Sequence, residues 1–337
     1  MQAPVNTVHF DNYRQGPTTE SPYRSLEHIP GFTAGGWFDA GDFDIETPSH
    51  DATLLSMVGT WEEFRPDRDQ TFIDPEKHYA EIHRPDGKAD LLQQIAHGVL
   101  PIVAQVEQIG HPCRGITLPT LYSYHHLGDA STETDNLVGT GDERWCFTSH
   151  DSFIDYYTAA ALAAVYRPLK DFNTPLADRC LRAARKVWED SKTTPAAAAV
   201  TAPTALELYK STGERGYLKA FNDSIFKALR LGGKERIGGL LTTALQACNV
   251  MDKGYMKKLR PYVETFKKTL DDKGKENPYG VDPVGENWGG NGAVVSQGVT
   301  AYYAHKYFPD IIDREAVLRP AHFLFGCHPD HNKSFVA

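Results

Sequence analysis

Apolar residues recur at three- and four-residue spacing through most of the chain beyond residue 50, a pattern typical of amphipathic helices. Between Asp90 and Gly110, for example, Leu91, Leu92 and Ile95 fall on one helical face, and the closing glycine suits a helix C-cap. The same spacing predicts further helices over residues 51–64, 151–167, 175–191, 195–212, 215–231, 237–250, 255–272, 293–307 and 313–326. Alternating runs with hairpin turns, which would predict strands, are scarce.

The connections between these helices are of two kinds. Short turns such as residues 211–213 alternate with long segments rich in glycine and proline, at 65–88, 111–150 and 273–292. Residues 1–50 form a further, largely irregular stretch, and loops of such length in a compact domain are usually functional. We therefore predict an all-α toroid of paired helices, with short turns at one rim and long loops at the other, where a cleft is expected.

Composition and charge exclude several classes of partner. The chain has 337 residues, about two domains' worth, although single barrels also reach this length. Its 35 Lys+Arg against 44 Asp+Glu give a net charge of −9, and it has no long basic block. We therefore expect no nucleic-acid partner and no docking on an anionic membrane. Because no run of about 18 apolar residues exists, we expect no membrane insertion.

The five cysteines are widely spaced and contain no C-x-x-C pair. An odd, scattered set argues against both a disulfide framework and a zinc finger. We expect them to be buried as small apolar side chains.

The candidate chemistry lies in the segment Gly35–Asp44, within the irregular N-terminal stretch. Two glycines precede an aromatic pair, and Asp39 and Asp42 then stand three residues apart. Gly41 between them allows a turn that a residue with a Cβ would resist, and such a turn would bring the two carboxylates together. Paired carboxylates can hold a water molecule and remove its proton, which is the general-base half of a hydrolysis. The alternative is an Asx-turn loop in which the carboxylates cap backbone N–H groups.

Residues 35–42, G-G-W-F-D-A-G-D, resemble the signature of glycoside hydrolase family 9, which includes cellulases and other endo-β-1,4-glucanases. The resemblance extends along nearly the whole chain. Residues 83–92 resemble the start of the family's early barrel helix, and residues 277–292 resemble its late substrate-side loop. Residues 323–336 resemble its Y-L-L-G-x-N-P…S-[FY]-V segment, with His328 where the family usually has Asn.

This resemblance implies an (α/α)6 barrel and hydrolysis with inversion at the anomeric carbon. Asp42 would be the general base, and Asp39 would position the attacking water. Inversion requires an acid roughly 6.5–9.5 Å from the base. In the family that acid is a Glu after the S-[FY]-V segment, so it is expected beyond Ala337, and Glu286 is not assigned to this role. Residues 1–337 are thus expected to form a single catalytic domain that is incomplete at its C-terminus and lacks its last helices.

Aromatic residues in the predicted loops are candidates for substrate binding, because aromatic rings stack on the apolar faces of pyranoses. They are Trp37, Trp145, Tyr279 and Trp288. Family members carry a sugar-stacking Trp near position 145, which makes Trp145 the best candidate subsite residue. Local packing is the alternative for each of them, since Trp is usually largely buried.

The reaction implied by the resemblance requires no cofactor, and we assign no catalytic metal. Some family members bind structural calcium through loop carboxylates, so Asp135, Asp142 and Glu143 are candidate ligands by composition. Adjacent side chains diverge unless the backbone turns sharply, so the pair His125 and His126 is not assigned as a metal site.

Three functions remain open at this stage. The first is an endo-acting hydrolase of β-1,4-linked glucan, with polysaccharide or oligosaccharide as its partner. The second is an exo-acting β-glycosidase of the same family, such as an exo-glucosaminidase, in which loops would block one end of the cleft. The third is a non-catalytic glycan-binding remnant, suggested by the unassigned general acid. Sequence beyond residue 337 with an H-H-R motif followed by a Glu would favour catalysis.

Residues 1–14 lack the basic-then-apolar pattern of a signal peptide. Polymeric glucan does not enter cells, so we nevertheless expect a secreted, periplasmic or cell-surface protein whose leader is not present in this sequence.

Overall fold

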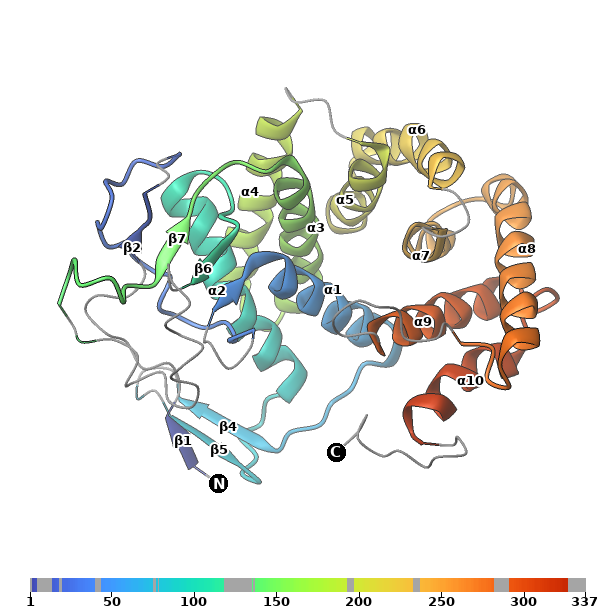
Figure 1. The fold of residues 1–337 in the computed structure, drawn as a ribbon, viewed down its shortest axis with the longest axis horizontal. Helices are drawn as coiled ribbons and strands as arrows, with labels where there is room; N and C mark the ends of the chain where they lie inside the picture. The colour runs from blue at the N-terminus through green and yellow to red at the C-terminus, as the bar shows by residue number, and fades with distance from the viewer. Residues whose placement is uncertain are drawn as a thin grey trace. The chain divides into compact units, whose positions relative to one another are not determined.

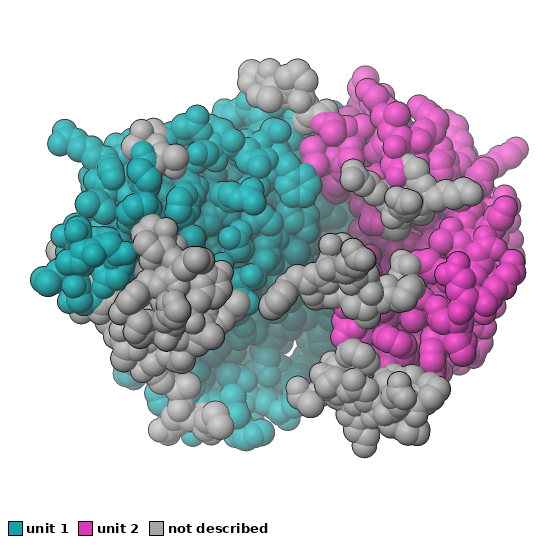
Figure 2. Space-filling model, in the orientation of Figure 1, with its two compact units in different colours: residues 1–196, 207–217 teal, residues 197–206, 218–337 magenta. Residues whose placement is uncertain are grey.

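The computed structural model describes residues 2–4, 14–17, 20–39, 44–74, 77, 79–117, 135, 137–192, 197–232, 237–281 and 291–326. Its internal contacts define two compact units (Figure 2): residues 1–196 with 207–217, and residues 197–206 with 218–337. Each unit buries its own set of apolar side chains. The single domain expected over residues 1–337 stays a prediction.

The helices follow the predicted ranges to within a few residues (Figure 1). They are α1 Thr47–Phe64, α2 Asp90–Ile109, α3 Ser152–Leu169, α4 Thr174–Ser191, α5 Ala198–Thr212, α6 Arg215–Leu231, α7 Ile237–Gln246, the short 3-10 helix η3 Ala247–Asn249, α8 Lys253–Glu276, α9 Asn291–Tyr307 and α10 Arg314–Leu324. Within the described residues, no helix combines the length and the apolar character needed to cross a membrane.

Local sequence explains where several helices begin and end. Gly110 caps α2 with a φ of +99°, a conformation that favours glycine, as the sequence predicted. Asp151 precedes α3 and its carboxylate accepts hydrogen bonds from the N–H groups of Phe153 and Ile154, at 2.8 and 3.4 Å. Such side chains satisfy N–H groups that have no partner within the helix. The same role falls to Asn173, Asp252 and Asp313.

Two small sheets were missed by the sequence pattern. One has the order β1-β5-β4 and the other β2-β7-β6-β3, with β2 and β7 parallel. The strands are β1 Gln2–Pro4, β2 Arg14–Gln15, β3 Ile45–Glu46, β4 Thr71–Asp74, β5 Tyr79–Ile82, β6 Gly115–Thr117 and β7 Trp145–Phe147. With two to four residues each, they are too short to show an alternating pattern, so long-range pairing decides them.

Helix α3 forms the centre of the first unit. It packs against α1, α2 and α4, and its residues from Ala159 to Val165 are almost wholly buried. By contrast, α4 is apolar on one face only, as expected for a helix that covers α3 from outside. Four of the cysteines are buried and unpaired, as predicted, and Cys327 lies outside the described residues.

Helices α1 and α3 run parallel. Near their N-terminal ends, the Thr158 hydroxyl of α3 donates to the Asp51 carboxylate of α1, at 2.6 Å. Near their C-terminal ends, Arg167 of α3 donates to Glu62 of α1, at 2.5 Å. Thr47 of α1 also bonds to Gln105, near the end of α2, so α2 is antiparallel to α1. The N-terminal ends of α1 and α3 and the C-terminal end of α2 therefore share one rim, which we call the loop rim.

The opposite rim of this unit holds a largely buried charge network. Arg167 donates to Glu62 and, also at 2.5 Å, to Glu207 of α5. Lys210 lies 2.7 Å from Glu62, and the Ser211 hydroxyl accepts a further hydrogen bond from Arg167. These two carboxylates raise the pKa of Arg167 against the lowering effect of burial. The network joins the C-terminal ends of three helices.

In the second unit, α9 packs against α7 and α10, and α7 also contacts α8. The hydroxyls of Thr242 and Thr300 join α7 to α9 at 2.7 Å. Tyr255 on α8 donates from its hydroxyl to the carbonyl of Ala244, at 2.9 Å.

We predict that Arg167→Ala lowers the free energy of unfolding by about 3–5 kcal/mol, because it leaves Lys210 alone to balance two largely buried carboxylates. Urea unfolding followed by circular dichroism measures the change. Arg185→Ala is the matched control, since its partner Glu214 and Arg185 itself are both about half exposed, and it should cost less than about 1 kcal/mol. Equal effects of the two substitutions would refute the structural importance of the network.

Candidate active site

The candidate carboxylate loop is attached to α2 by an unusually close backbone approach. The Gly36 N–H donates to the carbonyl of His97 at 3.0 Å, and Nε2 of His97 donates back to the Gly36 carbonyl at 2.9 Å. A Cβ on Gly35 would lie 2.1 Å from the His97 carbonyl oxygen, and one on Gly36 would lie 2.9 Å from Pro101. Both glycines also have positive φ values, +72° and +82°. Only glycine fits this approach, which accounts for the Gly-Gly pair.

The side chain of Trp37, the next residue of the loop, is also held by α2. Its indole N–H donates to Gln94 at 3.1 Å, and its ring occupies the space over Gly98, where a Cβ would lie 1.9 Å from Cη2. The ring also lies against His50, with centroids 5.4 Å apart. Trp37 is thus half-buried between α1 and α2 and fixes the start of the loop. Its predicted contact with substrate stays a prediction.

His50 connects the loop to α1, and this contact sets its tautomer. Its Nε2 accepts the backbone N–H of Trp37 at 2.9 Å, so the ring proton is on Nδ1, where it faces the Glu46 carbonyl at 3.1 Å. Burial lowers the pKa of His50, while the Glu46 carbonyl and the nearby charge of Asp39 act in the opposite direction. Burial likewise lowers the pKa of His97. The acceptor role of Nε2 requires a neutral His50 ring, and the lowered pKa favours that form.

Asp39 is exposed, as an acid that handles water should be. Its backbone N–H donates to the carbonyl of Asp44 at 2.8 Å, so the chain leaves and returns at nearly the same place on either side of residues 40–43. Asp42, the predicted general base, lies outside the described residues. The structure shows that Asp39 and Asp44, which flank the segment containing Asp42, are joined by this hydrogen bond just before the N-terminus of α1.

Asp51 follows His50 on α1 and is fully buried. Burial raises the pKa of its carboxyl group to about 8, against the lowering effect of the Thr158 hydroxyl. The helix predicted over residues 51–64 begins earlier than the sequence pattern indicated: α1 begins at Thr47, with Pro48 in its first turn. His50 and Asp51 face the neighbouring helices and the loop.

The remaining predicted substrate-binding residues are not brought together by the described structure. Trp145 lies half-buried on β7, and its indole nitrogen is buried without a hydrogen-bond partner among the described residues. Tyr279 belongs to the second unit, where its ring meets Phe323 edge-on with centroids 5.8 Å apart. Trp288 lies outside the described residues. Their roles in binding stay predictions.

The candidate calcium ligands lie in one loop, where their carboxylates accept hydrogen bonds from its backbone N–H groups. Asp142 accepts hydrogen bonds from the N–H of Asp135 and the hydroxyl of Thr140, at 2.9 and 2.7 Å. Glu143 is almost fully buried and accepts from the N–H groups of Gly139 and Gly141. Capping of this kind explains the positions of the carboxylates by itself. Calcium binding stays a prediction, and the pair His125 and His126 lies outside the described residues.

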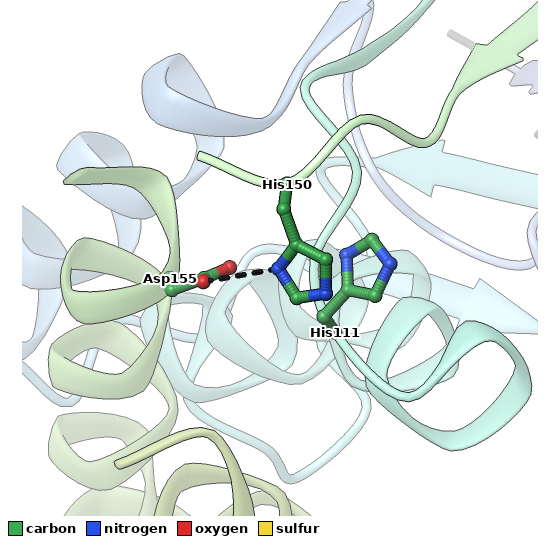
Figure 3. A group of neighbouring side chains, drawn as sticks. All are labelled: His111, His150 and Asp155. Carbon is green, nitrogen blue, oxygen red and sulfur yellow. Dashed lines mark hydrogen bonds and ion pairs between the residues drawn. The ribbon is translucent and has the colours of Figure 1, made fainter. Parts of the chain in front are cut away.

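A second group of titratable side chains lies on the loop rim (Figure 3). His111, His150 and Asp155 place possible ligand atoms within 4.8 Å of one another, and within the described residues no other group of three does so. However, the ring nitrogens of His111 face the carbonyls of Pro112 and Glu20, at 2.8 and 2.6 Å. The two imidazoles are stacked, with centroids 3.7 Å apart, and His150 faces Asp155 through Nδ1. In this arrangement His111 has no lone pair directed at an ion.

A cavity of about 700 Å³ runs along α2 on the side away from Trp37. Apolar residues form much of its lining, among them Ala34, Leu92, Leu100 and Phe172. Asp39 is not among the described residues that line it.

The sequence pattern missed His50 and His97, the two residues whose rings bond to the loop backbone. A signal was nevertheless present in Gly98, because a glycine within a helical pattern commonly has a packing reason. Here that reason is the Trp37 ring.

We predict that Gly98→Ala displaces Trp37 and destabilises the protein by about 1–3 kcal/mol, because overpacking outweighs the gain in helix propensity. Denaturant unfolding and tryptophan fluorescence measure both effects. Gly239→Ala in α7 is the matched control, since no atom lies within 4 Å of the added methyl group. A Gly98→Ala protein as stable as the control would contradict the proposed packing of the Trp37 ring over Gly98.

Titration of Asp51 predicts a specific pH dependence. Its pKa is about 8 in the folded protein against 3.8 as the ordinary value, so the folded state holds the proton more tightly. The stability it contributes is complete below the ordinary value and is lost as the pH rises toward the folded value. Asp51→Asn does not titrate, so from about pH 5 to about pH 8 it should gain at least about 1 kcal/mol relative to wild type. Urea titrations at each pH test this, and a constant difference would count against it.

Comparison with known proteins places this geometry in context. The family profile described as glycosyl hydrolase family 9 matches residues 31–337. A search of curated protein sequences finds no match.

Solved structures give the fold. A metagenome-derived family 9 endoglucanase superposes with a TM-score of 0.72 at 17% identity, covering 98% of this chain and 63% of its own. A single-mutant thermostable endoglucanase from Alicyclobacillus acidocaldarius gives 0.70 at 15% identity, with 96% and 62% covered. The cellulase Cel9M of C. cellulolyticum in complex with cellobiose gives 0.62 at 17% identity, with 88% and 69% covered.

The chain therefore spans less than two thirds of the length of the first two structures. The predicted (α/α)6 barrel fold is confirmed, because the mostly helical chain matches these structures along nearly all of its length. Since the family profile covers most of the chain, the protein belongs to glycosyl hydrolase family 9.

Proposed function

We propose that this protein hydrolyses β-1,4-linked glucan with inversion at the anomeric carbon. Asp42 is the general base and Asp39 positions the attacking water. The observation that supports this proposal is the closed turn between Asp39 and Asp44, whose ends are held 2.8 Å apart in a chain that belongs to this family. The Asp39 side chain is exposed, and in this proposal Asp42, within the segment that the turn closes, acts on the same water molecule.

In the proposed reaction, the water oxygen attacks the anomeric carbon from the face opposite the leaving group. Asp42 accepts one proton of this water, and Asp39 accepts a hydrogen bond from the other, which orients the oxygen lone pair. The glycosidic C–O bond breaks, and a general acid protonates the departing oxygen. We do not assign that acid to a residue of this chain.

The substrate class is supported by the names of the structural neighbours. Two of them are endoglucanases, and the third is a cellulase in complex with cellobiose. A β-1,4-linked glucose chain is uncharged, which suits a site walled by half-buried aromatic rings such as Trp37. Because a glucan polymer does not cross membranes, we further propose that the protein acts outside the cytoplasm.

The test uses a substrate that does not depend on the general acid. An aryl β-cellobioside with a strongly activated leaving group needs no protonation of that group, so its turnover reports on the base alone. Wild-type protein should release α-cellobiose. Asp42→Asn should lower turnover by about 10²–10⁴-fold, and added azide should restore release of the phenol, with the cellobiosyl unit recovered as α-cellobiosyl azide. Asp39→Asn should also be impaired, because water placement contributes to the barrier.

The stereochemistry is read by proton NMR of the first product. A β-configured product would overturn inversion, and wild-type turnover by Asp42→Asn would overturn the base assignment. Product lengths from cellohexaose separate internal from terminal cleavage. Hydrolysis of chitosan oligomers in preference to cello-oligosaccharides would favour an exo-glucosaminidase instead.

A further inference from the structure

An exposed aromatic ring stands on the first turn of α3, the most deeply buried helix of the first unit. The side chain of Phe153 is 52% exposed, whereas its neighbour Ile154 is 2% exposed. Single exposed apolar residues are common and need no explanation. Phe153, however, is not isolated, because its ring lies 5.7 Å from that of Tyr157, with the two planes inclined by 34°. The two rings form a continuous aromatic surface one helical turn long.

This surface lies at the loop rim, because the N-terminal part of α3 is joined to that of α1 by the hydrogen bond from Thr158 to Asp51, at 2.6 Å. Tyr157 lies next to Asp51 of α1: burial, and after it the charge of Asp51, raise the pKa of Tyr157 to about 12. Asp51 follows His50, which accepts the backbone N–H of Trp37 and lies within electrostatic reach of Asp39. Phe153 is one turn closer to the loop rim than Tyr157.

The chemistry of this surface suits a sugar better than a charged ligand. A β-1,4-linked pyranose has equatorial hydroxyls, so its two faces expose only C–H groups, which pack on aromatic rings. His150 and Asp155 lie on another side of α3, since a helix turns through about 200° between positions 153 and 155. They therefore contribute no charge to this surface.

We propose that Phe153, supported by Tyr157, is a stacking platform for one pyranose unit of a β-1,4-linked chain whose neighbouring units extend to the Asp39 loop. This inference rests on the proposed function, because it assigns the ligand from that substrate class. It adds Phe153 to Trp37 and Trp145 as a candidate residue for sugar stacking.

The platform is tested by calorimetric binding of cellobiose and cellohexaose to the full chain, in an Asp42→Asn background that limits turnover. Phe153→Ala should weaken cellohexaose binding by about 3- to 10-fold, the effect of losing one aromatic contact. Because cellobiose occupies fewer subsites, its binding should change less. Phe153→Trp should retain or strengthen cellohexaose binding.

Phe64→Ala is the matched control. Phe64 is 65% exposed but lies at the last position of α1, on the rim opposite the carboxylate loop. Its substitution removes the same side chain from an exposed helical position and should leave both affinities unchanged. Circular dichroism of each variant checks that the fold is intact.

The outcomes separate this inference from the proposed function. Equal cellohexaose affinity with and without the Phe153 ring overturns the platform and leaves the proposed function standing. Failure of the unsubstituted chain to bind either cello-oligosaccharides or chitosan oligomers overturns both. Binding of chitosan oligomers alone, weakened by Phe153→Ala, supports the platform and overturns glucan as its ligand.

Discussion

The close approach of the Gly35–Gly36 backbone to α2 is the constraint on which the candidate site depends. Residues 35–39, which lead into the aspartate segment, lie in no helix or strand, so their position depends on contacts with the neighbouring helices. Two hydrogen bonds with His97 and the seating of Trp37 over Gly98 supply that position from outside. A side chain at either glycine would collide with the helix, so the approach needs these residues and no others.

Once the loop is fixed, the parallel pairing of α1 and α3 determines what else lies near it. Thr158 and Asp51 join the helices at the loop rim, and Arg167 and Glu62 join them at the other end. The two ends differ in physical character. The loop rim carries Asp39 on an exposed turn, whereas the opposite rim holds charges that neutralise one another. The stabilising charge network and the candidate catalytic loop therefore lie at opposite ends of the same two helices.

The contrast between Asp51 and Glu62 shows how surroundings set the charge of a carboxyl group. Both lie on α1 and both are largely removed from water. Arg167 and Lys210 lower the pKa of Glu62 against the effect of burial, so it stays ionised. Among the described residues Asp51 accepts a hydrogen bond from the Thr158 hydroxyl and faces no cation, and burial therefore keeps it protonated near neutral pH. A neutral acid behind the loop adds no negative charge that would repel an ionised Asp39 or compete for protons there.

The sequence by itself determined the helices, because three- and four-residue apolar spacing reports directly which face of a helix is buried, as in Asp90–Ile109 with its closing Gly110. It also determined the aspartate motif and the family resemblance. It did not reveal the strands, whose two to four residues are fixed only by pairing with distant segments. Nor did it reveal that His50 and His97 hold the loop, or that the rings of Phe153 and Tyr157 meet at the loop rim. Those contacts join residues from different helices, and only the packing of α1, α2 and α3 brings them together.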